Sequence, residues 1–561
     1  MINKLEIIDK IIFAGLQEQD LTKDRLHKIK NEIYKTYKLQ KPIATIEIIQ
    51  RYNNLVRDGI IDDNNPFRKV IRKRGVRSLS GVTVISLLTK EFFCPGKCIY
   101  CPTFENLPKS YIPNEPAVQR AELNDFDPIL QIHNRLRALE ITGHKIEKND
   151  VRIIGGTWSV YPKNYKDEFI KGIYDAFNTY DEMKDFIETT DLSTDKFASF
   201  KLKAGYGLKK SKSLEEAKKL NETSRCRIIG IAIETRPDWI TPEEIFELRR
   251  YGITRVEIGY QTTIDEINIL NKRGHGNSES INATKLLKNA GFKVVAHMMP
   301  NLLGSTPELD RKSLREVFEN PLFRPDELKI YPMVVTDKSQ LTDIWKNGGF
   351  QPYDDKTLIN LTADLEEMIP EYVRLNRTYR DIPASEILAG SHLSNLRQLV
   401  EEKLQKKGVK LVDIRHREIK DKKNVASEAK LNIYEYEASD GKEYFLTFED
   451  NLDRTIFSLL RLRLPKKDEN NEIYSLLPEL KNSALIREIH TFGDQLSIGE
   501  RGSLFGQHLG FGKKLIEKAQ EIAKENGYEK IAVIAGVGVR GYYEKRGYEL
   551  DGEYMIKNLT K

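Results

Sequence analysis

Three cysteines in one short segment, FFCPGKCIYC, constrain this chain more than any other feature. Cys94, Cys98 and Cys101 have the spacing C-x-x-x-C-x-x-C, in which three thiolates hold three irons of a 4Fe-4S cluster and leave the fourth iron open. An open iron can chelate S-adenosylmethionine (SAM), and electron transfer into the bound sulfonium then releases a 5′-deoxyadenosyl radical. We expect Tyr100, before the third cysteine, to lie beside the adenine of SAM. The segment therefore predicts radical chemistry.

Two other uses of cysteine are a closed zinc site and a disulfide. A closed zinc site takes four ligands, usually from two paired halves, yet the remaining cysteine, Cys226, is isolated in the apolar run RCRIIGIAIE. We interpret Cys226 as a small buried hydrophobic residue. Disulfides are disfavoured because 561 residues include four cysteines and the first residues do not resemble a secretion signal.

The composition is that of a charged, folded protein with several domains. Of 561 residues, 39% are apolar and 31% are charged, and 90 Lys and Arg against 84 Asp and Glu give a net charge of +6. No apolar stretch approaches the length of a membrane span, so we expect no membrane partner. An oxygen-sensitive cluster together with few cysteines predicts a reducing, cytoplasmic location.

Residues 76–385 alternate short β-branched runs with longer polar segments of helical periodicity. This α/β alternation is typical of a parallel sheet that curls into a partial or complete TIM-type barrel. Six runs carry the pattern, at 81–89, 151–158, 228–238, 255–263, 292–302 and 328–335. Because the chemistry of such barrels lies at the carboxyl ends of the strands, the polar residues that end these runs are the candidates for a site.

Glycines and polar side chains end several of these runs. Gly155 and Gly156 let the backbone approach a ligand, which we expect to be the methionine part of SAM, and Glu234 could bind ribose hydroxyls. Taken alone, the glycine pair could form a tight turn, and each polar residue is more often a core or rim residue. Together, with Lys329 and Tyr331 in the last run, these residues outline one cavity. Besides Tyr100, the predicted SAM-binding residues are Gly155, Gly156, Thr157, Glu234, Arg236, Gln261 and His297.

Residues 1–75 have a helical and basic pattern, with tyrosines interleaved among lysines and arginines. A charge run usually marks a solvated helix face. However, six cations near the end of this region have no acid among them, which favours a surface that contacts nucleic-acid phosphates. The candidate RNA-binding residues are Arg68, Lys69, Arg72, Lys73, Arg74 and Arg77.

Residues 386–425 form a charged connector, and residues 426–561 form the last domain. Asp440-Gly441 predicts a β-hairpin between two strand-like runs. Further along, Gln507-x-x-Gly510-x-Gly512 places glycines where a helix begins, so that backbone N–H groups point at an anion. That helix has an apolar face at 3.6-residue spacing and ends at the C-cap signal Asn526-Gly527.

A strand and a short helix with two tyrosines follow the glycine loop. The order of strand, glycine loop, helix, strand and tyrosine helix is similar to that of the GNAT acetyltransferases, which bind acetyl-CoA. A phenol near the thioester sulfur could protonate a leaving thiolate. Aromatic core packing is the alternative for Tyr542 and Tyr543, and we expect it for one of the two.

The whole set of motifs resembles the catalytic acetyltransferase subunits of Elongator in their stand-alone archaeal form. The likeness covers the chain after about residue 70 and rests on SGVTVISLL, CIYCP, GGTW, IETRPD, VEIGYQ, FKVVAHMMP, LKIYP, RDIP, REIH, QHLGFG, IAVIAGVG and YYEKRGY. It implies a radical SAM barrel followed by a GNAT domain, behind a basic helical N-terminal extension. It also implies an enzyme that uses acetyl-CoA and SAM to install a carboxymethyl-type group at C5 of the wobble uridine of transfer RNA (tRNA). The expected partner is the anticodon stem-loop; Elongator-type subunits are allowed but not required.

The resemblance also implies roles for particular residues. Lys148 would contact acetyl-CoA from the radical SAM half, and Tyr543, with Tyr542 as the alternative, would act at the thioester. The other acetyl-CoA residues that it implies are Glu488, Ile489, His490, Thr491, Gln507, Gly510, Phe511, Gly512 and Lys513. Many archaeal members carry a cysteine-rich linker thought to bind zinc; this chain has Asp413 and His416 there but no cysteine, so we do not predict a zinc site there.

The resemblance implies that both modules face one cavity, because the acetyl methyl group has to meet the deoxyadenosyl radical. Two other functions remain open. A protein lysine acetyltransferase with a structural radical SAM module would acetylate peptides without SAM or a reductant. An RNA-binding scaffold would turn over no acetyl-CoA with any RNA.

Overall fold

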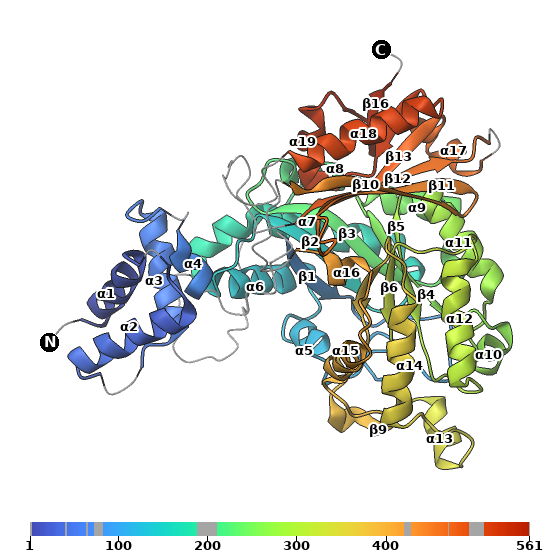
Figure 1. The fold of residues 1–561 in the computed structure, drawn as a ribbon, viewed down its shortest axis with the longest axis horizontal. Coiled ribbons are helices and arrows are strands. Elements are labelled where there is room, and N and C mark those ends of the chain that lie inside the picture. Colours follow the sequence, from blue (N-terminus) through green and yellow to red (C-terminus); the bar gives the residue numbers. More distant parts are fainter. Residues whose placement is uncertain are drawn as a thin grey trace.

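The computed structural model describes nine stretches of the chain, residues 3–18, 20–39, 42–62, 65–71, 82–187, 210–419, 428–468, 471–492 and 510–559. Figure 1 shows three parts: a helical N-terminal unit at one side, a central half-barrel, and a second sheet across one end of that half-barrel. No helix within these stretches is both long enough and apolar enough to cross a membrane.

The N-terminal unit consists of helices that pack around their own hydrophobic core. Its helices are α1 (Lys4–Leu16), α2 (Lys23–Thr36), α3 (Thr45–Arg57) and α4 (Pro66–Ile71). Asn3 and Thr22 cap α1 and α2 with their side chains, which explains why those helices begin where they do. Ile12, Ile49 and Phe67 are fully buried in the core. The helical pattern predicted for this region is confirmed over these helices.

The central sheet has seven parallel strands in the order β1-β2-β3-β4-β5-β6-β8. These strands are β1 (Thr83–Leu88), β2 (Lys148–Ile154), β3 (Arg227–Thr235), β4 (Arg255–Gln261), β5 (Lys293–Met298), β6 (Glu327–Ile330) and β8 (Arg374–Arg377). The sheet is open between β1 and β8, so it is a half-barrel. All six predicted runs contain a strand; β8, with the polar sequence RLNR, was not predicted.

Helices between successive strands cover the outer face of this sheet, and an apolar layer that includes Ile153, Ile231 and Val294 lies between them. The helices of this region are α5 (Pro116–Glu122), α6 (Pro128–Ile141), α7 (Lys163–Ile187), α8 (Leu214–Asn221), α9 (Pro242–Arg250), α10 (Asp265–Leu270), α11 (Asn277–Asn289), α12 (Pro307–Glu319), α13 (Gln340–Lys346) and α14 (Asp355–Glu367). Thr241 and Thr306 cap α9 and α12, each followed by a proline in the first turn.

The connector region packs against the half-barrel. Its described elements are β9 (Ile387–Ala389), which pairs with β7 (Val335–Thr336), α15 (Leu396–Lys406) and α16 (Ile414–Arg417). Leu396, Val400 and Leu404 of α15 pack on α14.

The second sheet has seven strands in the order β10-β11-β12-β13-β14-β16-β15. They are β10 (Lys430–Ala438), β11 (Gly441–Glu449), β12 (Ile456–Pro465), β13 (Ser483–Thr491), β14 (Lys530–Val533), β15 (Glu549–Asp551) and β16 (Tyr554–Asn558), with helices α17 (Ile473–Leu476), α18 (Phe511–Glu525) and α19 (Arg540–Glu544). The predicted helix after the glycine loop is confirmed as α18, and Gly527 ends it with a φ of +74°.

Two details of this sheet bear on function. Strands β13 and β14 pair in parallel only over Ser483–Ile486 of β13, so the rest of β13 continues without β14 beside it. The predicted hairpin is confirmed, but its turn residues are Ser439 and Asp440, with φ of +49° and +59°, whereas Gly441 already belongs to β11. Two adjacent residues with positive φ match the turn that suits the twist of a hairpin.

A buried ion-pair cluster joins the second sheet to the amino end of the half-barrel. Arg487 of β13 donates from Nη1 to Asp326 Oδ2 at 2.8 Å and from Nη2 to Glu443 Oε2 at 2.7 Å. Lys288 adds a contact of 3.3 Å to Asp326, and all four side chains are inaccessible or nearly so. Such a cluster fixes the position of the second sheet on the half-barrel, because a shift that separated its members would leave a buried charge without a partner.

Candidate functional site

The cysteine loop follows β1 and lies at the carboxyl end of the half-barrel. Cys98 is buried, while Cys94 and Cys101 are half-buried. A hydrogen bond with Cys101 lowers the pKa of the Cys98 thiol to about 4, with help from the Arg273 guanidinium and against the effect of burial, and the same hydrogen bond raises the pKa of Cys101. Thr157 Oγ1 lies 3.5 Å from Cys94 Sγ. The three sulfurs thus form one set, whose thiolate chemistry fits an iron–sulfur cluster.

Two arginines, Arg273 and Arg236, pack against the cysteine loop. Arg273 donates from Nη1 to Cys98 Sγ at 3.5 Å and from Nη2 to the carbonyl oxygen of Gly259 at 2.9 Å. Arg236 donates to the carbonyl oxygen of Arg273 at 3.0 Å, and a β-carbon at Gly96 would lie 2.5 Å from its guanidinium. The structure therefore brings Arg236, predicted as a SAM residue, against the loop that holds the cysteines.

The predicted glycine pair lies beside this loop. Gly155 and Gly156 have φ of +141° and +91°, which side-chain-bearing residues rarely adopt. A β-carbon at Gly155 would lie 1.9 Å from Thr89 Oγ1. Gln261, which ends β4, also has a positive φ (+67°), and its buried Oε1 has no hydrogen-bond partner among the described residues. Strain and an unpartnered acceptor at a strand end are features of ligand sites.

Tyr100 is buried beside Cys98 and Cys101, and burial raises the pKa of its hydroxyl well above the ordinary value. Its contact with an adenine, predicted from the sequence, stays a prediction.

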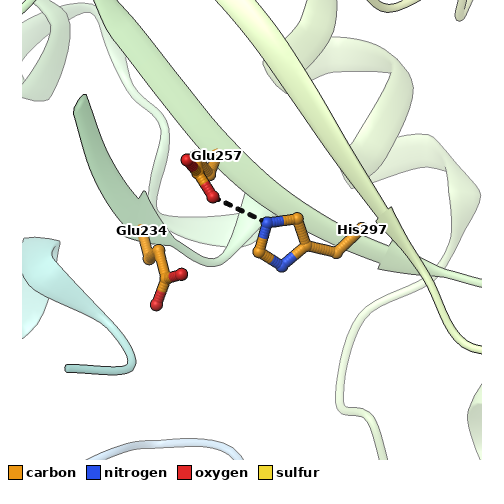
Figure 2. Close-up of side chains that lie close together, drawn as sticks. All are labelled: Glu234, Glu257 and His297. Carbon is orange, nitrogen blue, oxygen red and sulfur yellow. Dashed lines mark hydrogen bonds and ion pairs between the residues drawn. The ribbon is translucent and has the colours of Figure 1, made fainter. Parts of the chain in front are cut away.

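Three side chains from adjacent strands face one another inside the half-barrel: Glu234 of β3, Glu257 of β4 and His297 of β5 (Figure 2). His297 Nε2 donates to Glu257 Oε2 at 2.9 Å, and Tyr111 donates to Glu234 Oε2 at 2.8 Å. The three offer ligand atoms within 4.8 Å of one another, as a metal would require. However, the Lys329 ammonium contacts Glu257 and lies 3.8 Å from Glu234, so the group already contains a cation and we assign no metal to it.

Further ion pairs line the interior of the half-barrel toward its amino end. Arg255 pairs with Asp150 at 2.6 Å and with Glu327 at 3.6 Å. Lys293, the first residue of β5, lies 3.3 Å from Glu327 and 2.6 Å from Glu488 of the second sheet. The interior is thus filled with charged side chains from the site near the cysteines to the strand predicted to flank acetyl-CoA.

A second candidate site lies where α18 begins. Gly510 precedes the helix with a φ of +71°, and a β-carbon at Gly512 would lie 3.2 Å from Tyr542 Oη and 3.6 Å from Ile489 and Thr491. The structure therefore brings together the predicted strand, glycine loop and tyrosine helix. The Glu488 side chain, in contrast, points to Lys293 and Arg461, and that of Phe511 stacks on Phe448 at 4.4 Å. His490 stacks on Phe492 at 4.3 Å, Lys513 lies 3.6 Å from Glu517 on the helix surface, and Gln507 lies outside the described residues.

The two tyrosines of α19 have different surroundings. Tyr543 is 4% exposed and packs against Tyr548 in the core, and burial raises the pKa of its phenol. Tyr542 is 36% exposed, with its hydroxyl at Gly512 and its ring under the Arg546 guanidinium. The structure therefore favours Tyr542, the alternative in the sequence analysis, as the phenol that faces the glycine loop.

The two candidate sites lie at opposite ends of the half-barrel strands. Lys148 begins β2 at the amino end, where its neighbour in the sheet, Arg227, meets Gly538 of the second sheet's unit. Burial lowers the pKa of Lys148. The cysteine loop is at the carboxyl end, and a strand of six residues such as β5 spans about 20 Å. The expectation of one cavity that both modules face stays a prediction.

The predicted RNA-binding residues are mostly beyond what the structure describes. Arg68 is half-buried on α4, and α4 includes the backbone of Lys69. The other four, Arg72, Lys73, Arg74 and Arg77, lie outside the described residues.

Comparisons with known proteins agree with this architecture. The Radical SAM superfamily profile matches residues 92–315, and the Radical_SAM C-terminal domain profile matches residues 325–406. The tRNA uridine(34) acetyltransferase of Methanocaldococcus infernus is 37% identical, covering 99% of this chain and 98% of that protein. Elongator complex protein 3 of Danio rerio is 32% identical, covering 100% of this chain and 97% of that protein. The chain belongs to the Elongator complex protein 3 (Elp3) family.

A solved structure of the archaeal Methanocaldococcus infernus Elp3 with an N-terminal deletion (1–46) superposes with a TM-score of 0.69. It is 36% identical, and the match covers 85% of this chain and 99% of that chain. As a member of the Elp3 family with a radical SAM domain, the chain is a transferase.

Sequence reasoning gave no specific role to three residues of the candidate site. Arg273 lies in the loop between α10 and α11, and Glu257 lies within a strand pattern; in both settings a charged residue usually indicates a solvated face or an ordinary ion pair. Lys329 was noted in the last run but given no role. Only the pairing of β4, β5 and β6 shows that Glu257 and Lys329 meet.

Proposed function

We propose that this Elp3 family member is a tRNA uridine(34) acetyltransferase that installs a carboxymethyl-type group at C5 of the wobble uridine. The observation that carries the proposal is the pairing of a three-thiol loop with a glycine-loop helix in one chain. The names of the relatives from M. infernus and M. jannaschii support the substrate, since both are tRNA uridine(34) acetyltransferases that align over nearly the whole chain.

In this proposal Cys94, Cys98 and Cys101 hold a 4Fe-4S cluster whose open iron binds SAM. When bound, the two would supply a 5′-deoxyadenosyl radical able to take hydrogen from the acetyl methyl group; the resulting carbon would replace the hydrogen on C5 of uridine, which would leave as a proton, and the electron that began the reaction would be given back. Gly155 and Gly156 give the backbone room for a ligand, which supports their contact with SAM. The remaining SAM contacts that we propose are those of Tyr100, Thr157, Glu234, Arg236 and Gln261.

Acetyl-CoA would lie where β13 separates from β14, as in a GNAT domain. The start of α18 would hold its pyrophosphate through backbone N–H groups, since helix N-termini attract anions. Ile489 and Thr491 would flank the pantetheine, and the Tyr542 phenol would protonate a thiolate; the closeness of all three to Gly512 supports these roles. Because the second sheet contacts the amino end of the half-barrel while the cysteine loop lies at its carboxyl end, the acyl group would have to reach the barrel interior while still attached to its long pantetheine arm.

The anticodon stem-loop would bind the basic N-terminal region through its phosphates, with the uridine extruded into the half-barrel. Elongator-type partner subunits are compatible with this proposal but not required by it. A cytoplasmic location is also part of the proposal, because the cluster needs reducing conditions.

The test is a complete anaerobic reaction with tRNA, SAM, acetyl-CoA and dithionite, followed by mass spectrometry of the nucleosides. We expect a carboxymethyl-type uridine only when all components are present. Acetylated peptides without SAM would instead support a protein lysine acetyltransferase. Absence of acetyl-CoA turnover with any tRNA would support an RNA-binding scaffold.

A further inference from the structure

The pair His297–Glu257 has the geometry of a general base with its orienting carboxylate. Glu257 is 2% exposed, and its Oε2 accepts the Nε2–H of His297 at 2.9 Å. Burial alone would raise the pKa of Glu257, but the Lys329 ammonium and His297 lower it well below its usual range. The carboxylate is therefore charged, and its hydrogen bond fixes the imidazole as the tautomer with the proton on Nε2.

The other ring nitrogen is left for a ligand. His297 Nδ1 makes no hydrogen bond with any described residue, and Figure 2 shows it on the side of the ring away from Glu257. The ring packs edge-on against Tyr331 at 5.5 Å, which leaves the Nδ1 lone pair in a fixed direction. His297 lies near the carboxyl end of β5, the end of the half-barrel that also holds the cysteine loop. An imidazole so held can accept a proton at Nδ1.

We propose that His297, oriented by Glu257, is the general base that hydrolyses the thioester after the acyl carbon has joined uridine. This inference rests on the proposed function, in which the thioester carbonyl is one bond from the new C–C bond and so reaches the same cavity. Glu257 and Lys329 are positioning residues: Lys329 keeps the carboxylate charged, and the carboxylate holds the imidazole.

The step balances without any redox partner. An O–H bond of water breaks, and its proton goes to His297 Nδ1 as the oxygen bonds to the thioester carbon. The C–S bond then breaks, the CoA thiolate takes the proton of the Tyr542 phenol, and the imidazolium returns its proton to the phenolate through solvent. The hydroxyl group of water thus ends in the new carboxyl group and one proton ends on the thiol, and no electron is gained or lost.

The test uses single-turnover anaerobic reactions of full-length variants. After digestion, 5′-deoxyadenosine, the CoA-linked uridine and the free carboxymethyl nucleoside are quantified. For His297→Gly we expect 5′-deoxyadenosine within about twofold of wild type, a roughly 100-fold slower release of the carboxymethyl nucleoside, and accumulation of the CoA-linked nucleoside. Added imidazole should restore release, an effect that a merely structural role would not give. His392→Gln, at an exposed histidine, is the matched control and should behave as wild type.

Glu257→Gln keeps the side-chain shape and serves as a second variant, for which we expect roughly tenfold slower release with the same CoA-linked species accumulating. Release at the wild-type rate in His297→Gly would overturn the proposal. Loss of 5′-deoxyadenosine in both variants would also overturn it and place His297 at SAM instead. Failure of the proposed function has a different signature, because wild-type protein would then form neither the CoA-linked nor the carboxymethyl nucleoside.

Discussion

The substitution Glu488→Gln separates a role of this residue in acetyl-CoA binding from a role in the stability of the fold. Glu488 belongs to the strand predicted to flank acetyl-CoA, yet its carboxylate contacts Lys293 at 2.6 Å and Arg461 at 2.8 Å. Burial opposes ionisation, but these cations outweigh it and lower the pKa of Glu488 from 4.5 to about 2. At about 1.4 kcal/mol for each tenfold change in acid dissociation, the pairs contribute about 3 kcal/mol at neutral pH.

The sign of the pH dependence follows from the direction of this change. Because the folded-state pKa is below the unfolded one, the contribution is complete above about pH 5 and is lost as the pH falls through 4.5 toward 2. The same linkage leaves about 1 kcal/mol at pH 3. We therefore expect Glu488→Gln to lower the melting temperature of the unit that contains the second sheet by roughly 10 °C at pH 7 and by much less at pH 3.

Thermal unfolding followed by circular dichroism, with acetyl-CoA affinity measured in parallel, provides the assay. Affinity should change little, since the side chain points away from the glycine loop. Glu517→Gln, whose carboxylate is on the surface of α18, is the control and should shift melting by no more than a degree or two. Equal melting of Glu488→Gln and wild type at pH 7, or a large loss of acetyl-CoA affinity without destabilisation, would refute this reasoning.

Four further outcomes are expected. Cys98→Ser should abolish 5′-deoxyadenosine formation with the fold retained by circular dichroism; near-wild-type formation would contradict the cluster assignment. Gly155→Ala should lose SAM binding by at least roughly tenfold, because its β-carbon would lie 1.9 Å from a threonine hydroxyl; equal binding in titrations would refute this. Tyr542→Phe should lower turnover more than acetyl-CoA binding, whereas Tyr543→Phe should mainly alter stability; the reverse pattern in steady-state kinetics would exchange their roles. Changing Arg72, Lys73 and Arg74 together to Glu should weaken tRNA binding by more than roughly tenfold and reduce its dependence on salt. A smaller loss of affinity, or an unchanged salt dependence, would show that the basic segment is only a solvated face.

The elements that were predictable have local signals. Strand β1, which precedes the cysteine loop, follows a period-2 pattern, and the amphipathic helix α18 follows a period-3.6 pattern with glycine signals at its ends. Strand β8 was missed because its four residues, RLNR, are polar, and its place is fixed only by pairing with β6 and by contacts such as the hydrogen bond from Asn376 to Glu327. No window of sequence contains that information.

The candidate site divides in the same way. The cysteines and Gly155 could be identified from spacing and residue type alone. The Glu257–His297 pair could not, because it depends on the register between β4 and β5 across 40 residues of chain. Likewise, the choice between Tyr542 and Tyr543 depends on which face of a five-residue helix meets α18, and a helix that short has no clear periodicity.

The most direct measurement for the central claim follows the hydrogen of the acetyl group. The complete anaerobic reaction is run with acetyl-CoA that carries three deuterium atoms on its methyl group, and 5′-deoxyadenosine and the nucleosides are examined by mass spectrometry. The account predicts one deuterium in 5′-deoxyadenosine and two in the carboxymethyl group of the modified uridine. Unlabelled 5′-deoxyadenosine together with three deuterium atoms retained in a transferred acetyl group would contradict it.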